Sequence, residues 1–245
     1  IEAEDAEAFE GLTRELHPAD VADLIGLLHE EDREALIGLL GGALPSEVLA
    51  ELDEDILEDI VEAMEPEKVA EAVAELDTDD AAFVLEDLDE EKQAEILSLA
   101  PIEDRLALRA ALDFEEESAG RLMQRDFLAA PEFWNVGQTV DHARSNAEEL
   151  PDVFFEIYVI DPTFRVLGCV PLHKIMRTPR NVPLGEIMEE NKVEIPEDMD
   201  QEEVAYLFQK YDLTSAPVID ESGRLTGMVT IDDVVDVIQE ENRED

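Results

Sequence analysis

The chain has 245 residues, of which 45% are hydrophobic, and its 66 Asp and Glu against 17 Lys and Arg leave a formal net charge of −49. Such a charge repels nucleic acid and anionic lipid surfaces, so neither is an expected partner. No stretch approaches the roughly 18 consecutive apolar residues of a membrane span, and the N-terminus lacks the basic and apolar regions of a secretory signal. We therefore expect soluble globular domains, with any membrane-spanning part outside this sequence.

The excess of acids has two interpretations. Carboxylates form sites for hard cations, but they also solvate the surface, as in salt-adapted proteins. Exposed carboxylates are normal on helix surfaces, so for any single acid the second interpretation is favoured. Composition alone does not name a ligand.

Residues 1–119 are predicted to be helical throughout, because apolar residues recur at i, i+3, i+4 and i+7 between Pro, Gly, Asp and Thr. A weak repeat begins at His17, Leu44, Glu65 and Asp89, and each start carries Pro or acids in the first helical turn. Helices this short are not stable alone and must bury their apolar stripes against neighbours. We expect stacked helical hairpins that form a short solenoid.

After this region the pattern changes to strands among helices. The expected strands are 127–130, 154–160 and 166–170. The segment FFEIYVIDPTFRVLGCVPLHKIM from Phe154 is echoed by LTSAPVIDESGRLTGMVTIDDVV from Leu213. In both, a β-run ends in Ile-Asp, a tight turn reverses the chain, a second β-run crosses a glycine, and a helix follows. An internal duplication explains this pattern and predicts two related α/β modules.

The second copy contains S-A-P-V-I-D, G-M-V-T and I-D-D-V between Leu213 and Val235, and it resembles the C-terminal half of a CBS module. With an E-S-A-G-R-L-M junction and an acidic helical domain before it, nearly the whole chain resembles the cytosolic region of MgtE-family magnesium channels. The resemblance implies an all-α superhelical N domain followed by a tandem CBS (Bateman) α/β pair. The expected boundaries are 1–119 for the N domain, 120–185 and 186–238 for the two CBS domains, and 239–245 for the start of a plug helix.

The resemblance also implies magnesium sites built from acids on several surfaces. Mg²⁺ prefers octahedral oxygen ligands and keeps several waters, so one or two carboxylates from each surface suffice. The positions that match the family's metal-binding acids are Glu47, Asp79, Glu202, Asp212, Asp233, Asp236, Glu241, Glu244 and Asp245. A further family acid is replaced here by Phe83, one turn after Asp79. We therefore expect one site to be weaker or rearranged, with Asp80 or Glu86 as substitutes.

For function, the resemblance implies a magnesium sensor that is not an enzyme. Facing carboxylates repel one another, and a divalent ion between them converts this repulsion into attraction. Mg²⁺ that bridges the N domain, the second CBS domain and the plug helix is expected to favour a closed pore. The family's CBS pairs form homodimers, and a connecting helix leads into the transmembrane pore. We expect the chain on the cytoplasmic side of the cell membrane, joined to its own pore domain.

Two other functions stay open. CBS pairs commonly bind ATP or AMP, and Thr230 and Asp233 have the hydroxyl-to-acid spacing that contacts ribose in that wider group. The first module has lost the matching hydroxyl and acid, and Glu156 stands where an aromatic ring would stack on adenine, so this nucleotide site is compromised. Alternatively, the helical repeats are a scaffold that binds peptides.

Catalytic patterns are missing from the sequence. The histidines His17, His29, His142 and His173 are scattered, without the spacing of a triad or a zinc site. No P-loop or dinucleotide glycine fingerprint is present. The single cysteine, Cys169, excludes an intramolecular disulfide and a thiolate metal cage, and its apolar neighbours predict a buried strand thiol.

Overall fold

The computed structural model describes residues 9, 11, 13, 15–40, 44–86, 88–147, 150–151, 153–191 and 193–244, without the side chains of residues 39, 54, 103 and 240–244. The chain divides into two compact units, Ile1–Leu112 and Asp113–Asp245. Each unit has its own buried core.

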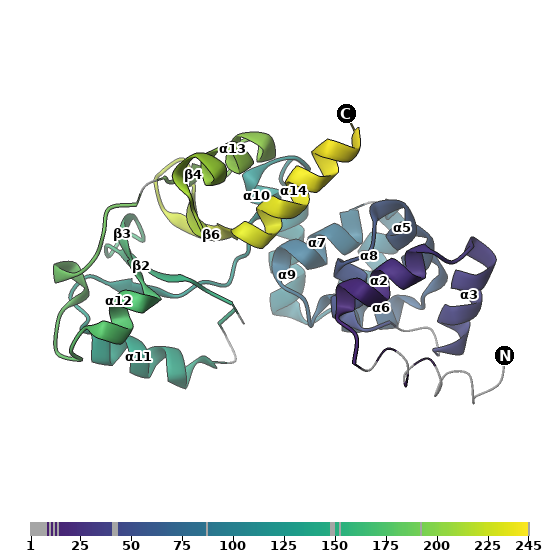
Figure 1. Cartoon of the computed structure of the whole chain (residues 1–245), viewed down its shortest axis with the longest axis horizontal. Coiled ribbons are helices and arrows are strands. Elements are labelled where there is room, and N and C mark those ends of the chain that lie inside the picture. The colour runs from purple at the N-terminus through teal and green to yellow at the C-terminus, as the bar shows by residue number, and fades with distance from the viewer. Residues whose placement is uncertain are drawn as a thin grey trace. The chain divides into compact units, whose positions relative to one another are not determined.

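The described part of the first unit is helical, and Figure 1 shows its helices from purple to teal. They are α2 (Pro18–Gly26), α3 (Glu30–Leu39), α4 (Ser46–Ala50), α5 (Glu54–Ala63), α6 (Pro66–Val73), α7 (Thr78–Glu86), α8 (Glu90–Leu99) and α9 (Ile102–Leu112). Proline opens α2 and α6, where its missing N–H costs nothing. Asp89 caps α8 by accepting hydrogen bonds from the amides of Glu91 and Lys92.

These helices pack as stacked hairpins, because most of them contact the next helix but one along the chain. The contacts join α2 to α4, α3 to α5, α6 to α8 and α7 to α9. Leu49, Val61, Leu85 and Ile96 are fully buried between them, and each such side chain contributes about 1.5–3 kcal/mol. The four predicted repeat starts open the helix pairs α2–α3, α4–α5, α6–α7 and α8–α9. The predicted superhelical N-terminal domain is confirmed.

The second unit holds two small sheets with helices. Its elements are α10 (Ala119–Leu122), β1 (Ala129–Pro131), α11 (Val136–Ser145), β2 (Glu156–Ile160), β3 (Val166–Pro171), α12 (Leu172–Arg177), the 3₁₀ helix η2 (Leu184–Glu186), β4 (Ile195–Pro196), α13 (Gln201–Tyr211), β5 (Ser215–Ile219), β6 (Leu225–Thr230) and α14 (Ile231–Glu244). We call β1, α11, β2, β3 and α12 the first module, and β4, α13, β5, β6 and α14 the second module.

The two modules repeat one topology. Their sheets have the orders β1-β2-β3 and β4-β5-β6, each with a parallel pair followed by an antiparallel pair. In each hairpin the register shifts at the same place, between Val159 and Ile160 in one and between Val218 and Ile219 in the other. The internal duplication into two related α/β modules, predicted from the sequence, is confirmed.

The hairpin turns match as well. The Oδ1 atoms of Asp161 and Asp220 each accept hydrogen bonds from the amides two and four residues later. Phe164 and Gly223 occupy equivalent positions with φ of 66° and 75°. Glycine adopts this left-handed conformation freely, whereas phenylalanine is strained in it. Both turns therefore have the same backbone geometry, although glycine suits this conformation and phenylalanine does not.

The segments before the modules cross over. Ala119 and Met123 are buried in the core of the second module with Val204 and Phe208, whereas Leu184 is buried in the core of the first module. The backbone of Gln124 pairs with Met228 of β6, and that of Glu189 pairs with Cys169 of β3. The domain boundaries expected from the sequence remain predictions. They divide the chain by residue order, whereas short segments before each module pack into the core of the other module.

The first strand of the first module differs from its predicted position. β1 covers Ala129–Pro131, and not residues 127–130. Phe127 lies before the paired residues and packs its ring edge-on against Tyr158, with ring centroids 6.4 Å apart. Its aromatic character reflects this packing and not strand pairing.

Candidate metal sites

The start of α14 carries the densest arrangement of predicted site residues. The amide of Thr230 donates to Asp233 Oδ2 at 3.0 Å, and the Thr230 hydroxyl lies 2.7 Å from the same oxygen. The hydroxyl also contacts Asp232 Oδ1. Because one hydroxyl has a single proton, it cannot donate to both acids at once. The carboxylates of Asp232 and Asp233 therefore share one hydroxyl proton, and this arrangement favours binding of a cation or of a further proton.

Burial raises the pKa of Asp233 to about 6, against the lowering effect of the Thr230 hydrogen bonds. The charges of Asp232 and Asp236 add to the rise. A bound cation would remove this unfavourable repulsion and return Asp233 to its ionised form. The electrostatics of this helix start thus favour a positive ligand.

Asp236 lies one turn further along α14 and is exposed. Its Oδ1 accepts a hydrogen bond of 3.5 Å from Gln239. Residues three apart share a helix face, so Asp233 and Asp236 address the same surface, as expected. Glu241 and Glu244 continue α14, but their side chains lie outside the described part of the structure, as does the whole of Asp245.

Glu202 and Asp212 lie at opposite ends of α13. Glu202 is in the first turn, and Asp212 ends the helix in the left-handed conformation with φ of 52°. Both side chains are exposed. A helix rises 1.5 Å per residue, so the two positions are separated by about 15 Å. One Mg²⁺, with ligands at about 2.1 Å, cannot bind both acids directly. The predicted metal-binding acids of the second module therefore cannot all be direct ligands of one ion.

In the first unit, Glu47 has a neighbour that the sequence did not indicate. The hydroxyl of Ser46 lies 3.3 Å from Glu47 Oε2 and 3.1 Å from Glu75 Oε2. Ser46 itself is buried, with 4% exposure. Two carboxylates thus converge on one hydroxyl, which makes Glu75 a further candidate ligand. Because 29 residues separate Ser46 from Glu75, no local pattern could have paired them.

Asp79 and Phe83 differ sharply in role. Asp79 is in the first turn of α7 and is only 9% exposed. Helix α7 packs on α4, which carries Glu47, so these two predicted ligands lie on neighbouring helices. Phe83 is half-buried and packs against the core of the unit. A core side chain thus occupies the position where the resemblance leads us to expect an acid, while Asp80 and Glu86 on the same helix are half-buried.

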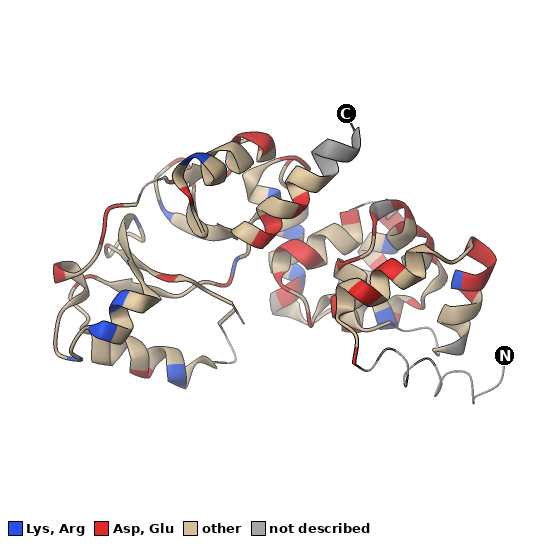
Figure 2. Ribbon diagram, viewed as in Figure 1, with Lys and Arg blue, Asp and Glu red and all other residues tan. Residues whose placement is uncertain are grey.

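Acids are spread along the helices of both units in Figure 2, and Lys and Arg are sparse. Among the side chains that the structure describes, no three His, Cys, Asp or Glu residues converge as a ready-made metal site. The described acids therefore form pairs, and not a closed metal cage.

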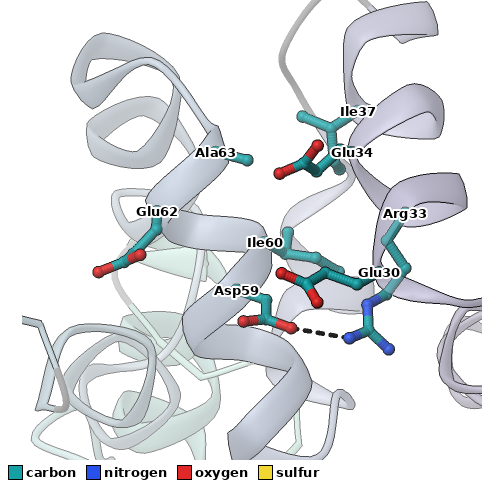
Figure 3. A pocket seen from close by; sticks show the side chains of 8 residues that line it. All are labelled: Glu30, Arg33, Glu34, Ile37, Asp59, Ile60, Glu62 and Ala63. Atoms are coloured by element: carbon teal, nitrogen blue, oxygen red, sulfur yellow. Dashed lines mark hydrogen bonds and ion pairs between the residues drawn. The ribbon is translucent and has the colours of Figure 1, made fainter.

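A hollow of about 180 Å³ lies between α3 and α5. Figure 3 shows Glu30 and Glu34 reaching into it from α3, opposite Asp59 on α5. Arg33 Nη2 pairs with Asp59 Oδ2 at 2.7 Å, and Arg33 Nη1 donates to the Leu28 carbonyl at 3.3 Å. The arginine already neutralises one of these acids, so the hollow is chiefly a contact that fixes the two helices.

A second acidic hollow, of about 290 Å³, lies in the second unit, beside the start of α10. It is lined by Glu115, Glu116, Glu117, Ser118, Asp198 and Asp200. Asp200 and Ser118 are the N-caps of α13 and α10 and accept backbone hydrogen bonds there. These two residues therefore have structural roles at the starts of two helices.

The residues considered for nucleotide binding form hydrogen bonds to neighbouring side chains of the chain itself. The Thr230 hydroxyl is engaged by Asp232 and Asp233, and Glu156 accepts a hydrogen bond of 3.1 Å from Ser215. In the first module, Lys174 pairs with Glu189 at 2.9 Å. A nucleotide would have to displace these internal contacts.

The cysteine is buried, as predicted, and two of the histidines make structural contacts. His17 caps α2 through Nδ1, and His142 packs edge-on against Trp134 with ring centroids 5.1 Å apart. Cys169 is 8% exposed, and burial raises the pKa of its thiol. A buried thiol with a raised pKa is a poor nucleophile and a poor metal ligand.

Together the fold and the acids define a helical-repeat domain followed by a CBS pair. The family model described as the MgtE intracellular N domain matches residues 16–117, and the CBS domain model matches residues 184–240. The magnesium transporter MgtE of Thermus thermophilus is 38% identical over 141 residues, which are 58% of this chain and 31% of that protein. The chain thus matches about a third of the length of the curated relatives.

Solved structures extend this likeness to nearly the whole chain. A crystal structure of the cytosolic domain of the Mg²⁺ channel MgtE in complex with ATP is 32% identical with a TM-score of 0.84, covering 94% of each chain. The soluble part of a magnesium transporter is 27% identical with a TM-score of 0.82, covering 97% of this chain and 93% of that one. The chain belongs to the MgtE family. None of the helices in the described ranges is long and apolar enough to cross a bilayer.

Proposed function

We propose that the chain is the magnesium-sensing regulatory region of a magnesium channel or transporter, and that it is not an enzyme. The observation that carries this proposal is the likeness over 94% of the chain to the cytosolic domain of a Mg²⁺ channel. The start of α14 supports it, because Asp233 lies beside Asp232 and Asp236 and burial and their charges raise its pKa. Such a group gains most when a divalent ion arrives.

In this proposal Mg²⁺ bridges the acids of the N domain, the second CBS domain and the plug helix, and favours the closed state. The paired acids at Ser46 and at the start of α14 each offer one or two oxygens, and water completes the octahedral shell. A ligand shifts a conformational equilibrium only by its preference for one state. Several weak sites that prefer the same state therefore give a steeper response than one strong site.

The proposal places the transport step in the part of the relatives that this chain does not match. The pore domain of the same protein is then the partner that the regulatory region controls, and the region acts on the cytoplasmic side of the membrane. We further propose a homodimer formed through the CBS domains, since closing a pore symmetrically requires two copies of the regulatory element.

A magnesium titration of the isolated chain tests the sensor. The measurements are small-angle X-ray scattering and limited proteolysis from zero to millimolar MgCl₂. The chain should become more compact and resist the protease, whereas Asp233→Asn with Asp236→Asn should lose most of this response. The matched control is Glu221→Gln, an exposed acid of the same module.

Sodium chloride at equal ionic strength separates a metal site from general screening of the −49 charge. If sodium compacts the chain as much as magnesium does, the acids merely solvate the surface. An unchanged magnesium response in the double variant would refute the site at α14. Replacing His173 should leave the response intact.

Adenine-nucleotide binding is the second candidate, because the related cytosolic domain was crystallised in complex with ATP. Here Thr230 and Asp233 are the candidate ribose ligands, and the negative field requires that Mg²⁺ accompany an anionic nucleotide. Isothermal titration calorimetry with ATP and with AMP, each with and without MgCl₂, measures this binding. Heat that is abolished by Thr230→Val would support the site, and the absence of heat with either nucleotide would eliminate it.

A further inference from the structure

The outer face of α2 is both apolar and acidic. Leu24 and Leu27 are 47% and 80% exposed, and Asp20 and Asp23 beside them are exposed as well. Counted from Asp20, these residues follow the spacing i, i+3, i+4 and i+7, so they share one side of the helix. The opposite side of α2 is buried in the core of the first unit. We call these four residues the α2 face.

The outer side of α9 has the same spacing but the opposite charge. Ile102 and Leu106 are 68% and 64% exposed, Arg109 is exposed, and Arg105 is half-buried. Neither arginine forms an ion pair with an acid among the side chains that the structure describes. The chain has only 17 Lys and Arg against 66 Asp and Glu, so an apolar and basic helix side is unusual in it. We call these four residues the α9 face.

The two faces complement each other when the helices run in opposite directions. Because both use the spacing i, i+3, i+4 and i+7, an antiparallel alignment matches all four positions, whereas a parallel alignment matches only two. The antiparallel alignment places Leu24 opposite Leu106, Leu27 opposite Ile102, Asp20 opposite Arg109, and Asp23 opposite Arg105. Apolar side chains thus meet apolar side chains, and each acid meets an arginine.

We propose that the α9 face of one copy of the chain binds the α2 face of another copy. Burial of the exposed apolar side chains drives the association, and the acid–arginine pairs set its direction. The two faces differ, so a copy that binds through one face keeps the other face free. Such a heterologous contact links copies into rows or rings, whereas the proposed homodimer through the CBS domains stops at two copies.

The net charge of −49 makes the copies repel one another at long range. In 0.15 M salt this repulsion is screened beyond about 8 Å, so the charges in direct contact decide the outcome. One helix side is smaller than the roughly 800 Å² per partner of a standard interface. The association is therefore weak and is expected at protein concentrations of about 0.1–1 mM.

Sedimentation equilibrium in 0.15 M NaCl with EDTA measures this association. The absence of metal makes the result independent of the proposed magnesium response. The weight-average mass of the parent chain should keep rising with protein concentration beyond the mass of two copies. A mass that stays at one or two copies up to about 1 mM would overturn the proposal.

Charge reversal tests the two faces separately. Asp20→Arg with Asp23→Arg reverses the α2 face, and Arg105→Glu with Arg109→Glu reverses the α9 face. Each variant alone sets like charges against each other, so its self-association should weaken by at least about thirtyfold. An equimolar mixture of the two variants should associate like the parent, because each reversed face then meets an opposite charge. The mean net charge of this mixture equals that of the parent.

Glu58→Arg with Glu67→Arg is the matched control, because it reverses two exposed acids of the same unit outside both faces. It should associate at least as strongly as the parent. Leu106→Gln changes an exposed side chain without changing the charge, so it should also weaken the association, and it serves if a reversed variant does not fold. A mixture of reversed variants that stays dissociated would refute the pairing, as would a control that dissociates like the reversed α2 variant.

Discussion

Thr230 and Asp233 close the start of α14 on themselves: the amide and the hydroxyl of Thr230 both meet the same oxygen, Asp233 Oδ2. The arrangement satisfies the backbone amide of Thr230 while placing a carboxylate where burial penalises its charge. A threonine and an acid three residues later therefore have a structural role here before any ligand binds.

The raised pKa of Asp233 predicts a pH dependence of stability. The folded state takes up this proton near pH 6 and the unfolded chain near pH 3.8. The free energy of unfolding should therefore rise as the pH falls through this window, by on the order of 1–3 kcal/mol from this group. Asp233→Asn should lack the rise, so urea unfolding without metal should show the variant gaining less than the parent between pH 7.5 and 4.5.

The control for this experiment is Glu221→Gln, which removes an exposed acid of the same module. General repulsion among acids also weakens at low pH, but it does so equally in the parent and in this control. Parallel curves for the parent and Asp233→Asn would contradict the assigned pKa.

The carboxylate pair at Ser46 predicts a role for Glu75 in magnesium binding. Removing either acid takes away one charge near the ion, which with the dielectric screening of bulk water is worth about 1 kcal/mol, or about fivefold in affinity. Calorimetric titration with MgCl₂ should show similar weakening for Glu75→Gln and Glu47→Gln. Glu58→Gln, an exposed acid of the same unit, should change nothing. If Glu75→Gln behaves like Glu58→Gln, the pair is not a site.

The two hairpin turns predict opposite effects of exchanging their left-handed residues. Phe164→Gly should raise the free energy of unfolding by about 0.5–1 kcal/mol, because strain at a positive φ is relieved and the phenylalanine is 55% exposed. Gly223→Ala should lower it by about 1 kcal/mol for the converse reason. Chemical denaturation measures both. A loss of stability in Phe164→Gly would show that the ring's packing outweighs the strain.

Gly227 lies against the backbone of Gln124, so a larger residue at position 227 is expected to lower stability. A Cβ here would lie 2.6 Å from the backbone carbonyl of Gln124, which is paired with Met228. Gly227→Ala should therefore cost about 1–3 kcal/mol through overpacking. Gly38, in the last turn of α3, has nothing within 4 Å of such a Cβ, so Gly38→Ala should stabilise its unit by up to about 1 kcal/mol. Thermal unfolding that ranks the two variants the other way would contradict this packing.

Much of the architecture could be read from the sequence because it is encoded locally. The helix pairs begin at His17, Leu44, Glu65 and Asp89, where proline and acids suit the first turn and apolar residues repeat at helical spacing. The duplication was visible because both hairpins keep the same Ile-Asp turn and the same strand glycine. Only the structure shows why both strands need this glycine: a Cβ would lie 2.3 Å from the Glu189 carbonyl oxygen at Gly168 and 2.6 Å from the Gln124 carbonyl oxygen at Gly227.

The acids that resemble the family's metal ligands were also named from the sequence, but the sequence determined only their identity and their helix faces. Tertiary structure decided that Glu75 joins Glu47 at Ser46, that Phe83 turns into the core, and that Glu202 and Asp212 lie a helix length apart. It also decided that the segment around Ala119 packs on the second module. These relationships join residues far apart in the chain, and they are fixed by burial and packing summed over many side chains, which no local pattern contains.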